Sequence, residues 1–118
     1  MATWSLMMAS RPDQKETTMK MMTKKLEAVM PALYSTDGTG YDAIAYAHYF
    51  SPFANLDWYM TEYDPDTKTG FGLVYGFYRE LGYFSIAEFK SMGIAIERDL
   101  YWSPKSLREI AESREEVM

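Results

Sequence analysis

The sequence predicts an α+β domain, in which a small antiparallel sheet of three to five strands has two or three short helices packed on one side. Three observations lead to this fold class. Runs of alternating apolar residues, separated by short turns, indicate strands that pair with their neighbours in an antiparallel sense. Helix-capping signals lie on both sides of these runs. The length of 118 residues and the apolar fraction of 47% suffice for one core and one domain.

The N-terminal part is expected to divide near Met19. Residues 1–18 show no hydrophobic period and are interpreted as a flexible leader, whereas residues 19–118 form the single domain. Thr23 has the side chain of a helix cap, and it predicts a short helix over residues 24–30. Pro31 ends that helix, because the residue before a proline is disfavoured in helical geometry.

Alternating side chains predict a run of strands in the middle of the chain. In the first strand, His48 shares one face with Ile44 and Phe50. The links between these strands are too short for a crossover, so the pairing must be antiparallel. The predicted strands cover residues 41–50, 56–63 and 71–78.

Two features of this region concern its turns and glycines. Residues 64–70, with the sequence Asp-Pro-Asp-Thr-Lys-Thr-Gly, predict a hairpin turn and lack the ligand pattern of a calcium loop. Gly72 and Gly76 repeat on one face of the third strand. We therefore expect a bulky neighbour to cover that face.

After these strands, the pattern becomes less regular. Residues 81–84 are consistent with a short strand or a turn. Ser85 and Glu88 form a capping-box pattern that predicts a helix ending near Gly93. Residues 94–96 are expected to add an edge strand.

The last helix has two possible starting points. Ser103 and Pro104 would place a proline in its first turn, whereas Ser106 and Glu109 offer a second capping box. The tail from Glu112 is densely charged and is expected to fray.

Composition excludes several kinds of chemistry. The chain has no Cys, so disulfides, thiolate metal sites and cysteine nucleophiles are excluded. It has one His, which excludes a multi-histidine metal site within one chain, and we expect no cofactor. No apolar run is long enough to span a membrane, and the N-terminus lacks the pattern of a secretion signal. We therefore expect a cytoplasmic protein that does not bind membranes.

The charge is unevenly distributed along the chain. The formal net charge is −5, and residues 26–78 carry seven acidic groups against Lys68 alone, a balance of −6. Such a segment repels nucleic acid and attracts basic partners, so direct nucleic-acid binding is not expected. Tyrosines flank the acidic groups, and such side chains suit protein recognition. The predicted partner-binding residues are Asp37, Asp42, Asp57, Tyr59, Glu62, Tyr63, Asp64 and Asp66.

His48 is the first residue to consider for catalysis. A general base needs an orienting partner, and Asp42, Asp57 or Glu62 could supply one. Its position within a strand that carries Phe50 on the same face favours a structural role instead. No serine lies in a nucleophile elbow and no glycine-rich loop has a phosphate-binding context, so we predict no catalytic residue.

Several motifs resemble those of one bacterial family. They are Lys24-Lys-Leu-Glu27, Met30-Pro-Ala-Leu-Tyr-Ser35, Asp42-Ala-Ile44, Trp58-Tyr-Met-Thr-Glu-Tyr-Asp64-Pro65, Phe71-Gly-Leu-Val74, Glu80-Leu-Gly-Tyr-Phe-Ser-Ile86 and Ile96-Glu-Arg-Asp-Leu100. Over residues 20–110 the chain resembles the family catalogued as domain of unknown function 2958. This resemblance implies an association with plasmids and integrated mobile elements, near antirestriction and DNA-transfer genes. It implies no catalytic residue.

Three functions remain open at this point. The first is a small non-enzymatic binding protein of a mobile element, in its specific form an inhibitor of a host nucleic-acid-targeting defence, of the anti-CRISPR or antirestriction type. Its acidic, tyrosine-rich surface would hold a basic protein partner. The second is an accessory protein that binds single-stranded nucleic acid. The third is an enzyme acting on a small molecule or nucleotide, with His48, Asp57 and Glu62 as its first candidate residues.

Overall fold

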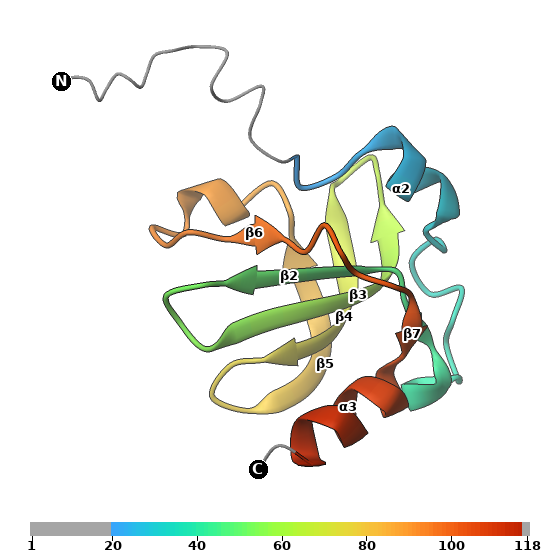
Figure 1. Cartoon of the computed structure of the whole chain (residues 1–118). Helices are drawn as coiled ribbons and strands as arrows, with labels where there is room; N and C mark the ends of the chain where they lie inside the picture. The colour runs from blue at the N-terminus through green and yellow to red at the C-terminus, as the bar shows by residue number, and fades with distance from the viewer. Residues whose placement is uncertain (1–19, 117–118) are drawn as a thin grey trace, which may run out of the picture.

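The computed structural model describes residues 20–116, and the predicted leader over residues 1–18 lies outside them. A five-stranded antiparallel sheet, with strand order β5-β4-β3-β2-β6, forms the centre of the fold (Figure 1). A separate two-stranded ladder joins β1 to β7. The strands are β1 (Ile44–Ala45), β2 (Ala47–Ser51), β3 (Leu56–Asp64), β4 (Thr69–Tyr75), β5 (Arg79–Ser85), β6 (Glu97–Arg98) and β7 (Lys105–Ser106), and the helices are α2 (Lys24–Val29), α3 (Leu107–Glu116) and the short 3₁₀ turns η2 (Gly40–Asp42) and η3 (Phe89–Ser91).

The architecture confirms the predicted α+β class and the antiparallel pairing. Strands β2 to β5 follow one another along the chain and across the sheet, and β6 adds to the free side of β2. Consecutive strands run in opposite directions and are joined by links of a few residues. The turns before β3 and before β5 therefore lie at one end of the sheet, and the turn before β4 lies at the other (Figure 1).

Both faces of the sheet are covered, which corrects the expectation of helices on one side only. On one face, Trp58 and Met60 of β3 belong to a core cluster against which Leu26 of α2 packs. On the other face, Tyr59 belongs to a second cluster with Leu107 of α3. Side chains from the central strand alternate between the two clusters, so β3 is buried from both sides and helices are needed on both.

The first helix signal was predicted correctly. The Thr23 hydroxyl accepts the backbone N–H of Leu26 at 3.1 Å, and α2 begins at Lys24, the residue after Thr23. The capping box of the last helix is also present, because the Ser106 Oγ and the Glu109 carboxylate accept each other's backbone N–H groups. The alternative start at Ser103 and Pro104 is wrong, since β7 intervenes before α3.

Two other helical predictions were wrong. Glu88 does donate its backbone N–H to the Ser85 Oγ at 3.2 Å, but the chain after it forms only η3 and no α-helix. A segment this short is only marginally stable as an α-helix, even with a cap at its start. The tail expected to fray from Glu112 is also helical, because α3 continues to Glu116.

The edge strand predicted over residues 94–96 lies slightly later in the chain, at β6 (Glu97–Arg98).

A β-bulge in β3 decides which way its last residues point. The pairing with β4 shifts between Met60 and Glu62, so Thr61 has no partner in the register. Met60 and Tyr63 consequently belong to the same core cluster, and Glu62 points away from it. A Cβ on Gly72 would lie 1.9 Å from the Tyr59 carbonyl oxygen. Glycine at this position therefore allows the backbone of β3 to approach closely.

Candidate functional site

His48 lies between two carboxylates on the α3 side of the sheet. Its Nε2 lies 2.7 Å from Asp57 Oδ1, and its Nδ1 lies 3.0 Å from Asp99 Oδ2. Asp57 is the residue across from Phe50 in the β2–β3 pair, and Asp99 follows β6 directly. Each ring nitrogen of His48 therefore lies within hydrogen-bond distance of its own carboxylate oxygen.

Aromatic rings and one arginine enclose this histidine. The His48 ring stacks on Tyr59, with centroids 4.4 Å apart and planes 5° from parallel, and Trp102 lies against it at 5.2 Å. Arg114 of α3 completes the cluster. Its guanidinium lies 3.3 Å from Asp57, donates to the Tyr59 hydroxyl at 3.0 Å and lies 3.8 Å above the Tyr75 ring.

The charges in this cluster stabilise one another. Burial alone would raise the pKa of Asp57, but the hydrogen bond from His48 and the positive charge of Arg114 lower it overall. Burial raises the pKa of Tyr59, and the negative charge of Asp57 adds to that effect. Burial alone would lower the pKa of Arg114, which the hydrogen bond to Tyr59 and the charge of Asp57 raise instead.

The cluster is arranged as a closed ion network. Of the three carboxylates considered for His48, only Asp57 reaches it; Asp99 was not anticipated. The two ring nitrogens point in different directions, so the carboxylates of Asp57 and Asp99 lie at different sides of the ring and do not converge on one position. Within residues 20–116, no group of three His, Asp or Glu side chains could hold a metal ion.

Three of the predicted partner-binding residues are buried, and this corrects their expected placement. Tyr59, Glu62 and Tyr63 are 5%, 2% and 4% exposed. Tyr59 belongs to the His48 cluster, and Tyr63 packs in the core beneath α2. The Glu62 carboxylate accepts the backbone N–H groups of Tyr34 and Thr36 at 2.8 and 2.9 Å, so it anchors the loop before η2.

The remaining acidic residues come from separate segments. Asp37 lies in the loop before η2, and Asp42 is the last residue of η2 and is ion-paired with Arg108 of α3 at 2.9 Å. Asp64 and Asp66 lie at the turn between β3 and β4, where Asp64 accepts the backbone N–H of Asp66 at 3.1 Å. Of these four residues, Asp37, Asp42 and Asp66 are exposed, whereas Asp64 is half-buried.

Three exposed aromatic residues that the sequence reasoning missed lie in two turns at one end of the sheet. Phe53, in the turn before β3, is 86% exposed; Phe77 and Tyr78, in the turn before β5, are 102% and 80% exposed. The two turns project from the same end of the sheet (Figure 1), and Leu56, the first residue of β3, borders Gly76 in the turn after β4. We call Phe53, Phe77 and Tyr78 the aromatic end. The strand predicted over residues 71–78 is wrong at its end, because β4 ends at Tyr75 and places Phe77 and Tyr78 in the turn that follows.

The fold and its surfaces define a small α+β protein with a closed ionic core cluster and a solvent-exposed aromatic end. No helix within residues 20–116 has the length and apolar character needed to cross a membrane. The family model of DUF2958, a protein of unknown function, matches residues 14–116, so the chain belongs to that family. No curated protein and no solved structure matches this chain.

Proposed function

We propose that this protein is a small non-enzymatic binding protein whose contact with a partner protein centres on the aromatic end. The exposure of Phe53, Phe77 and Tyr78 is the observation that carries the proposal. Exposed apolar side chains that cluster on one part of a monomer mark interaction sites more often than isolated ones do. Aromatic side chains also dominate the binding energy of protein interfaces.

The exposed area of Phe53 and Phe77 sets the free energy that their burial against a partner could contribute. Complete burial of one Phe against a partner contributes about 1.5–3 kcal/mol. Phe53 and Phe77 therefore offer most of that gain without any rearrangement of the core, because neither side chain supports the fold. Both lie on turns held by paired strands, so their backbones lose little conformational freedom on binding.

A basic partner fits the charge of the chain. The net charge of −5 attracts basic proteins at long range, and Glu80 lies two residues beyond Tyr78 on the exposed side of β5. In its specific form, the proposal is inhibition of a nucleic-acid-binding defence effector of a host. The acidic residues Asp37, Asp42 and Asp66, which are exposed, would then contribute attraction and the aromatic end would contribute affinity.

The arrangement of His48 favours binding over catalysis. Both of its ring nitrogens are already engaged by carboxylates, at 2.7 and 3.0 Å. A general base needs a free nitrogen within reach of substrate. Of the three residues considered for an enzyme, His48 and Asp57 contact each other in the ion network. The third, Glu62, accepts the backbone N–H of Tyr34 and anchors the loop before η2.

Cross-linked capture from the native host tests the proposal with three forms of the full chain. The wild type should retain one defined protein, and Phe53→Ser/Phe77→Ser/Tyr78→Ser should lose it. The matched control is Leu100→Ser/Tyr101→Ser, because those side chains are 55% and 94% exposed but lie between β6 and β7. Purified components should then reproduce the difference, with all three proteins equally folded by circular dichroism. Equal binding by the triple variant contradicts the proposal, as does equal loss in the control.

A further inference from the structure

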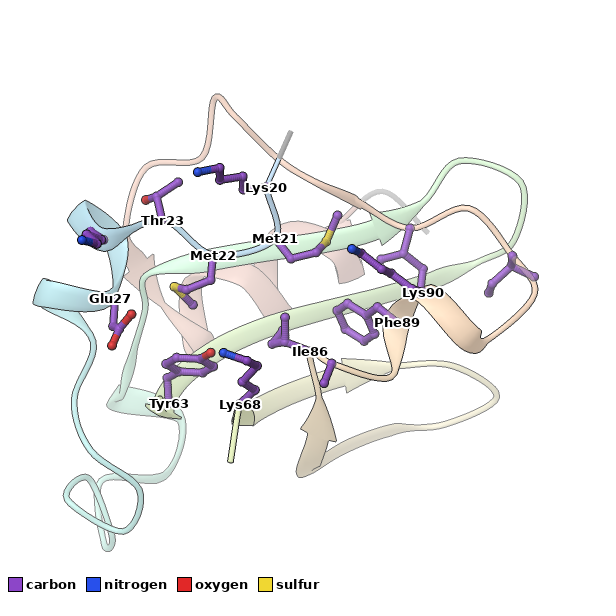
Figure 2. A pocket seen from close by; sticks show the side chains of 14 residues that line it. Lys20, Met21, Met22, Thr23, Glu27, Tyr63, Lys68, Ile86, Phe89 and Lys90 are labelled. Carbon is purple, nitrogen blue, oxygen red and sulfur yellow. The ribbon is translucent and has the colours of Figure 1, made fainter. Parts of the chain in front are cut away.

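A lysine-rimmed groove lies on the face of the sheet that α2 covers, away from the His48 cluster. Its volume is about 1120 Å³, and Met21, Met22, Ile94 and Ile96 supply much of its apolar lining. Figure 2 shows Met21 and Met22 beside Ile86 and Phe89, with lysines arranged around them. Among the described residues, the lining thus combines an apolar floor with lysine side chains.

The walls of the groove are fixed by hydrogen bonds from the sheet. The Tyr49 hydroxyl donates to the Met21 carbonyl, and Arg98 Nε donates to the Lys20 carbonyl at 2.6 Å. On the opposite wall, the Ile86 backbone N–H donates to the Lys68 carbonyl at 2.9 Å. These contacts hold the segment before α2 against β2 and β6, so the groove is a formed feature of the fold.

The charge of this surface is opposite to that of the whole chain. Four lysines border the groove, and Glu27 is the one carboxylate among the described residues that line it. The chain as a whole has a net charge of −5. Figure 2 shows Lys20, Lys68 and Lys90 at separate positions around the apolar lining, so positive charge is not confined to one end of the groove. The four are Lys20, Lys24, Lys68 and Lys90.

The groove continues past α2. A second hollow of about 480 Å³ shares Lys24, Glu27 and Tyr63 with the first and adds Met30 and Pro65. Compact ligands fill pockets of about 300–1,000 Å³ and use few charged contacts. An elongated surface with four dispersed cations suits a ligand that presents several carboxylates along an apolar stripe, as one face of an amphipathic helix does.

The lining distinguishes such a helix from single-stranded nucleic acid. Nucleic-acid binding surfaces stack bases on accessible aromatic rings. In this groove Tyr63 and Phe89 are both only 4% exposed, whereas Ile94 is 38% exposed. The accessible floor is therefore aliphatic and thioether in character, and flexible Met side chains adapt well to apolar helix faces.

We propose that this groove binds an acidic amphipathic helix of a partner protein, with apolar side chains on the methionine and isoleucine floor and carboxylates on the four lysines. The site is separate from the aromatic end, so a partner could engage either surface or both. Failure of this proposal leaves the proposed function untouched, because the two surfaces share no residue.

Fluorescence anisotropy with a synthetic helix tests it on the full chain. The probe is a labelled peptide of about four helical turns with a leucine stripe flanked by glutamates. It should bind, and the affinity should fall as salt rises. Lys68→Glu/Lys90→Glu should weaken binding about tenfold or more. Ile94→Ser should weaken it without loss of fold, since that side chain is partly exposed.

The matched control is Lys25→Glu/Lys105→Glu, which makes the same charge change at lysines outside the groove. It should retain binding. Equal weakening in both double variants, or equal binding of a lysine-flanked peptide, overturns the proposal. So does tighter binding of an oligothymidine of the same charge, which would identify a nucleic-acid site. Displacement of the probe by a peptide of residues 1–19 would assign the groove to the chain's own N-terminal segment and would also overturn it.

Discussion

The buried carboxylate of Glu62 holds the backbone of Thr36, which precedes it by 26 residues in the chain. The two oxygens of Glu62 accept from Tyr34 and Thr36, and the Thr36 hydroxyl donates to the same carboxylate. Tyr34 has a φ of 72°, a left-handed conformation that a tyrosine adopts only when its surroundings impose it. One side chain of β3 therefore determines the path of the loop before η2.

Replacement of this carboxylate should destabilise the fold. In Glu62→Gln, the amide nitrogen would replace one of the two carboxylate oxygens, so the backbone N–H of Tyr34 or of Thr36 would lose its acceptor. We expect the free energy of unfolding to fall by about 2 kcal/mol. Urea denaturation of Glu62→Gln beside Glu109→Gln measures this, since Glu109 is an exposed carboxylate that also accepts a backbone N–H. An equal effect in the two variants would show that burial of Glu62 is unimportant.

Two glycines that are partners in the sheet should respond in opposite ways. Gly72 of β4 pairs with Gly82 of β5, but only at Gly72 would a Cβ collide with the backbone, at 1.9 Å from the Tyr59 carbonyl oxygen. Gly72→Ala should lower the free energy of unfolding by about 3 kcal/mol or more. Gly82→Ala should leave it unchanged or raise it slightly, because nothing lies within 4 Å of its Cβ. Thermal unfolding of both variants provides the comparison, and similar melting temperatures would contradict it.

The lowered pKa of Asp57 predicts a pH dependence with a definite sign. A carboxyl group whose pKa is lower in the folded state contributes stability that is complete above its unfolded pKa, about 4, and is lost as the pH falls through the folded value. Asp57→Asn should therefore be less stable than the wild type near neutral pH. The difference between the two should shrink below about pH 4. Guanidinium titrations across this range measure it, and a difference that stays constant would exclude the ionic contribution.

Two arginines of α3 form ion pairs in very different surroundings. Arg114 combines its contact with Asp57 with a position 3.8 Å above the Tyr75 ring, whereas Arg108 pairs with the exposed Asp42. Arg114→Lys should lower the free energy of unfolding by about 1 kcal/mol, because a lysine loses the planar stacking. Arg108→Lys should change it by less than about 0.5 kcal/mol, as exposed pairs contribute little. Chemical denaturation of both variants tests this contrast, which fails if Arg108→Lys is the more damaging.

Features that depend on a few neighbouring residues could be predicted from the sequence. Thr23 and Leu26 are three residues apart, and so are Ser106 and Glu109, so each cap is visible in the sequence. The hairpin turn at residues 64–70 was likewise identified from its own composition. The antiparallel order followed from the short links between strands.

The arrangement of the candidate site depended on contacts that the sequence does not encode locally. Asp99 reaches His48 across 51 residues, and Arg114 reaches Tyr59 across 55. The bulge at Thr61 reverses the alternation of β3, so Glu62 could not be assigned to a face by counting in twos. For these reasons the acidic residues looked like one surface in the sequence, while folding divides them among a core network, a buried loop anchor and separate loops.

The order of strands across the sheet also has a kinetic consequence. Strands β2 to β5 are neighbours both along the chain and in the sheet, so only short loops must close to pair them. In contrast, β6 returns to β2, and α3 packs on Tyr59, across much longer separations. Short-range contacts generally form faster than long-range ones. We therefore expect amides of β3 and β4 to be protected early in pulsed hydrogen exchange, before the docking of α3 encloses His48.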